Sequence, residues 1–237
     1  MWLISNKILV RDSGLFEDFC DSHCHLLPKV DDGIKKQEDA LYILEQWEAL
    51  GIKEVWMTPH IMEDIPNEPA DLKKRFKEFQ SAYTGQIKLH LAAENMMDGL
   101  LLQRLEERNV LTLDTKETQL LVETSYFNPP MGMEDIIDKI KEKGYTPVLA
   151  HPERYQYMDM RDYKKWKAAG MLFQLNVPSI VEAYGVFVQK KAETLLKEGM
   201  YDCCGSDTHD IRFMKQFLDA KLPKKLIKSI RQISGQI

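Results

Sequence analysis

Cysteine is scarce in this chain of 237 residues, and its spacing excludes the usual cysteine-based sites. The four cysteines are Cys20, Cys24, Cys203 and Cys204, and no two of them have the Cys-x-x-Cys spacing of a zinc ribbon or a redox pair. A cysteine-dependent phosphatase needs an arginine six residues after its thiolate, but leucine, valine, histidine and aspartate occupy the four corresponding positions. That mechanism is therefore excluded, and we expect the cysteines to be buried free thiols.

Long hydrophobic runs and an excess of positive charge are also absent. No stretch approaches the ~20 apolar residues that a membrane span needs, and residues 1–10 lack the apolar centre and small-residue cleavage site of a signal peptide. The 37 acidic residues outnumber the 32 lysines and arginines, so the formal net charge is −5. The chain therefore lacks the excess of positive charge that binds the phosphate backbone of a nucleic acid. We expect a cytoplasmic protein that inserts into no membrane and binds no nucleic acid, while its oligomeric state stays open.

Short apolar runs alternate with longer amphipathic stretches, which is typical of a mostly parallel sheet with helices between its strands. In the helix predicted at 37–50, for example, Ala40, Leu44 and Trp47 recur at helical spacing, and Gly51 ends the helix. The predicted strands cover residues 17–21, 52–57, 87–93, 119–122, 146–150, 171–176 and 201–205. The other predicted helices cover residues 71–83, 98–107, 133–143, 162–169, 186–198, 211–220 and 223–233. The length suits one α/β barrel domain spanning residues 1–237.

Histidine is concentrated in a few motifs rather than spread evenly. Five of the six histidines lie in four short polar motifs, and only His90 lies outside them. The motifs are Asp21-Ser22-His23-Cys24-His25, Thr58-Pro59-His60, Ala150-His151-Pro152-Glu153-Arg154 and Ser206-Asp207-Thr208-His209. Because side chains alternate along a strand, His23 and His25 point to one side and Cys24 points to the other, into packing. Histidine is the commonest metal ligand, so this distribution indicates a site with several metal ions.

The polar motifs also share a position in the predicted fold, because each falls just past the C-terminal end of a strand. In strand order, the residues found there are His23 and His25, His60, Glu94, Glu123, His151, Asn176, and Asp207 with His209. Parallel α/β barrels build their active sites at this end. A mixed shell of imidazoles and carboxylates suits Mn²⁺, Fe²⁺ or Zn²⁺ better than Ca²⁺ or Cu(I). We assign no role to Asn176.

Taken in order, the motifs resemble those of the polymerase and histidinol phosphatase (PHP) superfamily. The resemblance covers residues 18–210, and it includes the segments 23–33, 58–60, 150–155 and 205–209. Within the superfamily, the chain is most similar to the bacterial protein-tyrosine phosphatases that act with capsular and exopolysaccharide tyrosine kinases.

The resemblance implies a distorted, TIM-like (β/α)7 barrel with a centre of three divalent metal ions. Manganese is the expected metal, with iron and zinc as alternatives. The implied ligands are His23, His25, Asp207 and a bridging Glu94 for the first ion, Glu94, Glu123 and His151 for the second, and Asp32, His60 and His209 for the third. Asp31 is an alternative to its neighbour Asp32.

The implied activity is hydrolysis of phosphotyrosine in proteins, with the tail of a tyrosine kinase of polysaccharide biosynthesis or export as the expected partner. A metal-bridging hydroxide would attack phosphorus, so no protein nucleophile is needed. A phenol with a pKa of ~10 leaves without a dedicated general acid. Arg154 is the expected phosphate clamp, because a guanidinium binds two oxygens, unless it forms a structural salt bridge to Glu153 or a neighbouring loop. By the same resemblance Arg212 is a second catalytic arginine, although it follows its motif more closely than usual.

Two other functions stay open on the sequence. A PHP phosphoesterase with the same metal centre could act on a small phosphorylated metabolite, such as histidinol phosphate. A non-catalytic barrel could use metals only to stabilise its fold or to regulate a kinase by binding, although no expected ligand is missing. The apolar segment 126–133 could line a pocket for an aromatic ring or cover the barrel rim.

Overall fold

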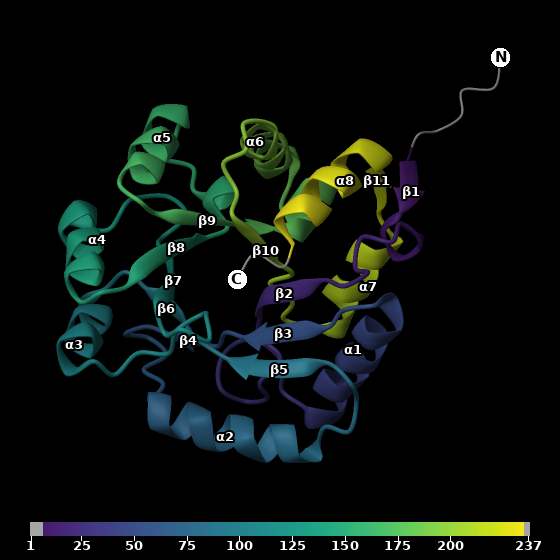
Figure 1. Ribbon diagram of the computed structural model, residues 1–237, viewed down its shortest axis with the longest axis horizontal. Helices are drawn as coiled ribbons and strands as arrows, with labels where there is room; N and C mark the ends of the chain where they lie inside the picture. The colour runs from purple at the N-terminus through teal and green to yellow at the C-terminus, as the bar shows by residue number, and fades with distance from the viewer. Residues whose placement is uncertain (1–6, 235–237) are drawn as a thin grey trace.

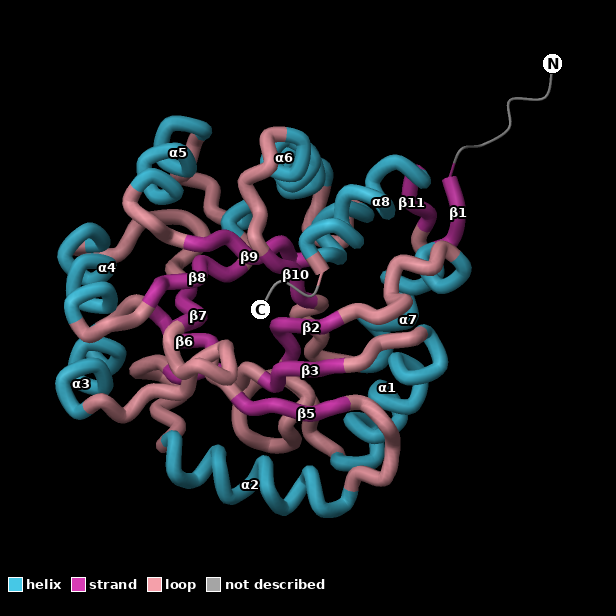
Figure 2. Tube along the Cα trace, in the orientation of Figure 1, coloured by secondary structure: helices cyan, strands magenta, loops and turns pink. Residues whose placement is uncertain are grey.

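Parallel strands curl around a common axis and helices cover their outer face (Figure 1, Figure 2). The computed structural model describes residues 7–234. The segment 1–10, which we expect not to be a signal peptide, therefore lies largely outside the described residues. The parallel strands are β2 (Cys20–Cys24), β3 (Glu54–Met57), β4 (His60–Ile61), β5 (Lys88–Leu91), β6 (Glu94–Met96), β7 (Gln119–Glu123), β8 (Thr146–Ala150), β9 (Leu172–Asn176) and β10 (Cys203–Gly205). The helices are α1 (Gln37–Leu50), α2 (Pro69–Ala82), α3 (Gly99–Glu107), α4 (Met133–Glu142), α5 (Met160–Ala168), α6 (Val186–Lys197), α7 (Ile211–Asp219) and α8 (Lys224–Ile233). The predicted α/β barrel class is confirmed.

Two strand positions are broken, which makes the barrel irregular. Pro59 lies between β3 and β4, and Ala92 with Ala93 separates β5 from β6. As a result, β2, β3 and β5 form one sheet, while the other has the order β10-β9-β8-β7-β6-β4. Hydrogen bonds from Ala92 N to Met57 O (2.9 Å) and from Glu94 N to Pro59 O (3.1 Å) continue the pairing across the breaks. The sequence analysis ends the predicted strands at residues 57 and 93, so it predicts neither β4 nor β6.

The first and last parallel strands close the ring. Asp207 N donates to His23 O at 2.7 Å, and His25 N donates to Thr208 O at 3.0 Å. Gly205 permits this approach, because a Cβ at its position would lie 2.4 Å from the Cβ of His23. Motifs from the two ends of the chain therefore meet, and Figure 1 shows β10 beside β2.

The helices follow the predicted order, with ends shifted by one or two residues. α1 covers the predicted range and buries Ala40, Leu44 and Trp47, and it ends at Gly51 with a φ of 98°. α2 begins at Pro69, two residues before the prediction, because proline suits the first turn of a helix. α5 also begins two residues early, because the Asp159 side chain caps its first turn.

A short antiparallel pair lies beside the barrel. β1 (Lys7–Leu9) pairs with β11 (Lys221–Pro223), which separates α7 from α8. The sequence predicts two helices here with no strand between them, because three residues carry too little periodicity to reveal a strand. Among residues 7–234, no helix is both long and apolar enough to cross a membrane.

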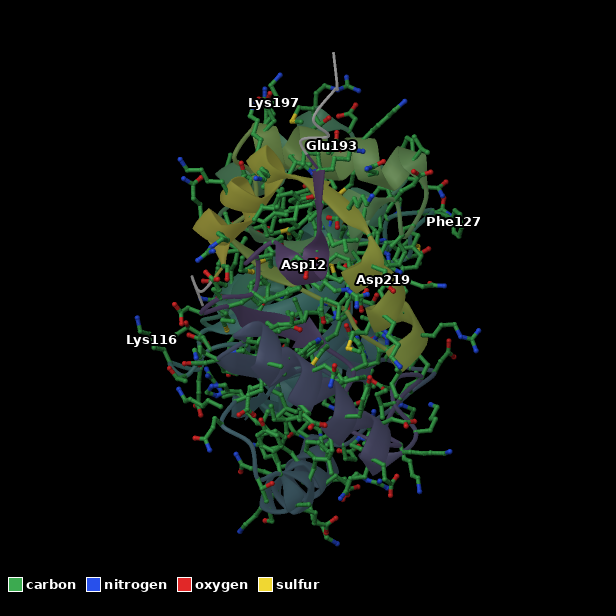
Figure 3. The ribbon with its side chains drawn as sticks, turned by 90° about the vertical axis from the view of Figure 1, so that its right-hand side faces the viewer. Asp12, Lys116, Phe127, Glu193, Lys197 and Asp219 are labelled. Carbon is green, nitrogen blue, oxygen red and sulfur yellow. The ribbon has the colours of Figure 1, made fainter. Side chains whose placement is uncertain are left out.

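The ends of the β7 strand show which way the barrel opens. Lys116 precedes this strand and Phe127 follows it, and Figure 3 places them on opposite sides of the molecule. The motif-bearing loops leave the strands on the Phe127 side. Within the apolar segment 126–133, the Phe127 side chain is 65 % exposed, whereas Pro130 and Met131 line a cavity of about 760 Å³ together with residues of α3 and α4.

Candidate metal centre

The predicted ligands come together at the C-terminal mouth of the barrel. His25 and His151 follow directly after β2 and β8, and Asp207 lies two residues after the end of β10. The prediction that every motif lies past its strand needs correction, because His23, His60, Glu94 and Glu123 are themselves strand residues. His151 (φ 35°) and Asp207 (φ 50°) have left-handed backbone, a strain of ~1–3 kcal/mol each that proteins retain mainly at functional sites.

Ligand atoms fall into three groups, and within each group they lie within 4.8 Å of one another. The groups are His23 with His25 and Asp207, His60 with Glu94 and Glu123, and His25 with Asp32, His60 and His209. His151 is outside these groups of the described residues, but its Nε2 lies 2.8 Å from Oε1 of Glu94. The structure thus brings all nine predicted ligands to one mouth.

The first group has two imidazoles that face each other. Nδ1 of His23 lies 2.7 Å from Oε1 of Gln174, and Nδ1 of His25 lies 2.8 Å from Oδ2 of Asp31. Because these oxygens accept the ring protons, both Nε2 atoms carry lone pairs in the neutral rings. The Nε2 atoms are 3.2 Å apart, and Oδ1 of Asp207 lies 3.5 Å and 3.4 Å from them. Two lone pairs and a carboxylate directed at one point suit a bound cation.

Glu94 is the central residue of the site and is fully buried. Its Oε2 lies 3.2 Å from Nε2 of His23, 3.3 Å from Nε2 of His25 and 3.2 Å from Nδ1 of His60. This oxygen has no hydrogen-bond partner, and neither have Nδ1 of His60 and Oε1 of Glu123, which are 3.0 Å apart. Buried polar atoms without partners are rare in folded proteins. Three of them within one pocket of ligand atoms fit the donor set of a metal ion.

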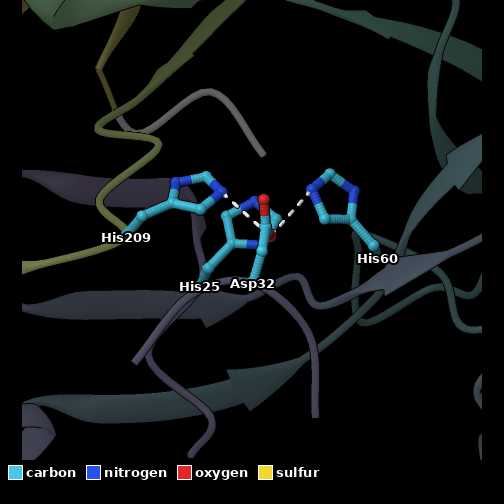
Figure 4. Close-up of side chains that lie close together, drawn as sticks. All are labelled: His25, Asp32, His60 and His209. Atoms are coloured by element: carbon cyan, nitrogen blue, oxygen red, sulfur yellow. Dashed lines mark ion pairs between the residues drawn. The ribbon is translucent and has the colours of Figure 1, made fainter. Parts of the chain in front are cut away.

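The third group is more open than the other two. Figure 4 shows Asp32 between His60 and His209, whose Nε2 atoms each lie 3.5 Å from Oδ1 of Asp32. The ring of His25 stacks on that of His209 with a centroid distance of 3.9 Å. The Asp32 side chain is 65 % exposed, so this group meets solvent. His60 faces two groups, through Nδ1 towards Glu94 and Glu123 and through Nε2 towards Asp32, whereas the family resemblance implies a role at the third ion only.

Asp31 and Asp32 have different surroundings. The buried Asp31 accepts hydrogen bonds from Nδ1 of His25 (2.8 Å), from the backbone N of His60 (3.1 Å) and from that of Gly33 (3.0 Å). Its oxygens are therefore occupied by donors, while Asp32 faces imidazole nitrogens. This geometry favours Asp32 as the ligand and gives Asp31 the task of orienting His25.

The electrostatics of the site follow from burial and mutual charge. Burial raises the pKa of Glu94 and of Asp207, but the neighbouring imidazoles, first that of His23, outweigh it and hold both pKa values well below their usual range. Burial lowers the pKa of His25, but Asp207, Asp31 and Glu94 outweigh it and raise this pKa well above its usual value. Without metal, protons on the imidazoles balance the buried carboxylates, and a cation would replace those protons.

Arg154 reaches the same mouth from the turn after β8. Its Nη1 donates to Oδ2 of Asp207 at 2.6 Å. The guanidinium carbon lies 4.4 Å from the ring centroid of Tyr126 and 4.4 Å from that of Tyr184. Of the alternative salt bridges, the one to Glu153 is absent, since Glu153 accepts hydrogen bonds from Asn176 N and the Tyr201 hydroxyl. A salt bridge to a neighbouring loop is present, because Asp207 lies in the loop after β10. The Arg154 cation is thus bound to a predicted ligand.

The comparison with protein families agrees with this arrangement. The family model for capsular polysaccharide synthesis, CpsB/CapC, matches residues 19–220. The chain belongs to the CpsB/CapC family.

Individual relatives of the CpsB/CapC chain are distant but match over most of their length. The tyrosine-protein phosphatase YwqE of Bacillus subtilis (strain 168) is 27% identical over 199 residues, which cover 81% of this chain and 78% of that protein. The tyrosine-protein phosphatase CpsB of Streptococcus agalactiae is 25% identical over 218 residues, which cover 84% of this chain and 86% of that protein.

A solved structure shares the fold. It belongs to the crystal structures of YwqE from Bacillus subtilis and CpsB from Streptococcus pneumoniae, described as unique metal-dependent tyrosine phosphatases. The TM-score is 0.69 at 22% identity, with 92% of this chain and 96% of that chain covered. The predicted resemblance to the metal-dependent phosphatases of polysaccharide synthesis is confirmed.

Two polar residues of this CpsB/CapC site were not predicted to have a role. Gln174 donates its amide Nε2 to Ser22 O (3.1 Å), which turns its Oε1 towards Nδ1 of His23. Asn176 donates to Oδ2 of Asp207 at 2.9 Å. Both lie on β9, two positions apart, so they share one face of that strand. Polar residues at alternate positions of an otherwise apolar strand are a signal that the sequence does contain.

Arg212 has a different place from Arg154. It is exposed in the first turn of α7, where no hydrogen bond or ion pair links it to another described residue. It lines a cavity of about 760 Å³ together with His209, Lys36 and Lys215. This cavity adjoins the third ligand group, so Arg212 lies at the rim of the CpsB/CapC site rather than inside it.

Proposed function

We propose that this chain is a metal-dependent protein-tyrosine phosphatase that acts on phosphotyrosine proteins of capsule or exopolysaccharide synthesis. Its family, the activity named for its relatives and the imidazole and carboxylate groups at the barrel mouth support this proposal. One observation carries it: Oε2 of Glu94 is buried, has no hydrogen-bond partner and lies within 3.3 Å of nitrogens of His23, His25 and His60. A buried carboxylate oxygen that meets only imidazole nitrogens needs positive charge beside it, which either protons on the rings or a bound metal ion can supply.

The donor set fits three divalent ions. We assign the first to His23, His25, Asp207 and Glu94, the second to Glu94, Glu123 and His151 with Nδ1 of His60 nearby, and the third to Asp32, His60 and His209. Nitrogen and oxygen ligands without a thiolate favour Mn²⁺, with Fe²⁺ or Zn²⁺ as alternatives. Cys24 adds no ligand, because its Sγ donates to Trp56 O at 3.4 Å within the core.

Bound ions of this kind lower the pKa of water from ~16 towards ~7 and neutralise phosphate charge. The residues of the chain determine where the phosphate lies. Oδ2 of Asp207 holds Arg154 beside the first ligand group, so a phosphate at that group also meets the guanidinium. Arg212, with Lys36 and Lys215 in the adjoining cavity, attracts the dianion to the mouth. No cysteine thiolate is available, because burial raises the pKa of Cys203 to about 12 and that of Cys24 well above its usual value.

The open third group suits a phosphotyrosine carried on a protein. A flexible tail can present its phosphate to the exposed Asp32 side, whereas a deep pocket would select a small metabolite. The tail of a cytoplasmic tyrosine kinase of polysaccharide export is such a substrate. A phenol leaves readily at a pKa of ~10, so the site needs no dedicated general acid.

The proposal is tested by hydrolysis of a phosphotyrosine peptide, a phosphoserine peptide and histidinol phosphate with Mn²⁺ and with a chelator. We expect hydrolysis of the phosphotyrosine peptide alone, and only with metal. Glu94→Gln should lower kcat/KM by ~100-fold or more, because it removes the charge shared by the ligand groups. Arg212→Ala should raise KM and change kcat little, because Arg212 lies at the rim.

Glu106→Gln is the matched control, since Glu106 is a surface carboxylate paired with Lys139 and Lys143. It should leave the kinetics unchanged. Preferential cleavage of histidinol phosphate would keep the metal centre and reject the protein substrate. Binding of Mn²⁺ without cleavage of any ester would identify a non-catalytic regulator instead.

A further inference from the structure

Two aromatic rings pack against the Arg154 guanidinium. Tyr126, from the loop after β7, and Tyr184, from the loop before α6, each place a ring centroid 4.4 Å from the guanidinium carbon. These two loops lie far apart in the sequence, and both contact this cation. A guanidinium over two rings gains a cation–π attraction from each of them, and any movement away from either ring weakens that attraction.

The edge of the same guanidinium is almost unused. Only Nη1 donates within the described part of the chain, to Oδ2 of Asp207 at 2.6 Å. The side chain is 17 % exposed, so its remaining N–H groups are neither paired with protein nor fully open to water. The unused N–H groups of a guanidinium bind an oxyanion in the plane of the cation.

The two tyrosines are themselves held in place. The hydroxyl of Tyr184 accepts a hydrogen bond from Asn176 Nδ2 at 3.1 Å, and its ring packs on Phe213 with a centroid distance of 5.6 Å. The ring of Tyr126 stacks on Tyr155 at 6.2 Å. Burial raises the pKa of both Tyr126 and Tyr184, so both phenols stay neutral. The rings therefore act as fixed walls and not as acids.

We propose that Tyr126 and Tyr184 are positioning residues for substrate binding. Their rings hold the Arg154 guanidinium beside Asp207, where its unused N–H groups can bind a phosphate placed at the metal groups. This inference rests on the proposed phosphatase function only for the identity of the anion. The rings act through Arg154, and the benefit is preorganisation: the anion meets a guanidinium that has already lost its freedom to turn.

The test compares Tyr184→Phe, which keeps the ring and loses the hydroxyl, with Tyr184→Leu, which loses the ring. Calorimetry measures the binding of inorganic phosphate to the Mn²⁺-loaded proteins, and steady-state kinetics with a phosphotyrosine peptide separate KM from kcat. We expect Tyr184→Leu to weaken phosphate binding and to raise KM by ~5- to 10-fold each, while Tyr184→Phe stays within ~2-fold of the parent protein. Tyr126→Leu should behave like Tyr184→Leu.

Tyr145→Leu is the matched control, because Tyr145 is a partly buried tyrosine that precedes β8 at the opposite end of the barrel. It should lower thermal stability without changing phosphate binding.

Unchanged phosphate binding in folded Tyr184→Leu and Tyr126→Leu would overturn the proposal. An equal loss of phosphate binding in Tyr184→Phe would also overturn it, because that result would assign the effect to the hydroxyl. If Tyr184→Leu fails to fold, Tyr126→Leu decides the question. If phosphate binding depends on the rings but the protein cleaves no phosphotyrosine, the positioning role of Tyr126 and Tyr184 is supported and the proposed function is rejected.

Discussion

At the residue scale, the site depends on where each imidazole places its proton. His23 and His25 could each bind metal through either nitrogen, but Gln174 and Asp31 accept at Nδ1 and leave Nε2 for the mouth. A carboxylate in this role also makes the imidazole more basic and a stronger ligand. Asp31 additionally binds the backbone of His60, so one buried side chain orders two ligand-bearing segments.

Asp31→Asn should therefore weaken Mn²⁺ binding by roughly 10- to 100-fold, although Asp31 is assigned to no metal ion. The amide keeps the shape of the side chain but loses the charge that His25 faces. Competition with a fluorescent chelator measures the affinity, and excess Mn²⁺ should restore much of the activity. Asp138→Asn on the surface of α4 serves as the control. Equal Mn²⁺ affinity in Asp31→Asn and the parent protein would show that Asp31 does not orient the ligand.

At the scale of one element, the side chains of β2 alternate between two faces, so the ligands lie on one face and the packing residues lie on the other. His23 and His25 point into the mouth, while Cys24 between them is fully buried in the core. The alternation is a property of any strand, so the sequence alone predicts it correctly. It also assigns the cysteine of this motif a structural role, because its thiol hydrogen-bonds to Trp56 O.

Cys24→Ala should keep metal-dependent activity within ~2-fold and lower the free energy of unfolding by ~1 kcal/mol, the usual cost of a small cavity. Peptide hydrolysis with Mn²⁺ and denaturant unfolding measure the two effects. His25→Ala is the partner variant: it changes the next residue, which lies just past the end of β2 and faces the mouth, and it should abolish hydrolysis. Loss of activity in folded Cys24→Ala that still binds Mn²⁺ would contradict this separation of faces.

At the scale of the whole molecule, the curled sheet gathers ligands from β2 to the end of β10. The metal groups join the first and last parallel strands, so bound metal stabilises the closed barrel and not one element alone. A ligand that binds only the folded state at a hundred times its Kd adds about 2.7 kcal/mol. For a chain of this length, that energy raises Tm by ~5–10 °C.

We expect this increase in Tm to grow with pH. The pKa of His25 is raised, so its contribution to stability without metal is present below about 6.5 and is lost as pH rises through the folded pKa. The pKa values of Glu94 and Asp207 are depressed, so their contribution is present above about 4.5 and is lost as pH falls through the folded pKa values. The metal-free protein is therefore most stable between about pH 4.5 and 6.5, where protons fill the site.

Because Mn²⁺ must displace those protons, the gain in Tm on adding Mn²⁺ should be larger at about pH 8 than at about pH 6. Thermal unfolding with Mn²⁺ and with chelator at both pH values measures the difference. Mg²⁺ at the same concentration is the control, because it prefers oxygen ligands and should stabilise less. A gain that is equal at both pH values would show that the histidines do not exchange protons for metal.

The sequence by itself determined the alternation of strands and helices and the set of residues at the barrel mouth. Strand and helix periodicities are local, and the order of the motifs places each ligand at a strand end whatever the exact pairing. The same reasoning fails where the outcome depends on distant atoms. The chain leaves β3 at Thr58-Pro59 and β4 then pairs with β6, and nothing within residues 52–57 indicates that pairing.

Only the tertiary structure shows which of two adjacent carboxylates faces the metal site. Only the tertiary structure also shows which atoms the polar side chains meet. Asp31 and Asp32 are equivalent carboxylates in the sequence, and only the fold buries one beneath His25 and exposes the other to His209. Likewise, Tyr126 and Tyr184 meet Arg154 through loops that no local pattern connects. Such contacts depend on the orientation of side chains across the closed barrel. Local periodicity specifies the face on which a side chain lies, whereas the atom it meets depends on the packing of the whole chain.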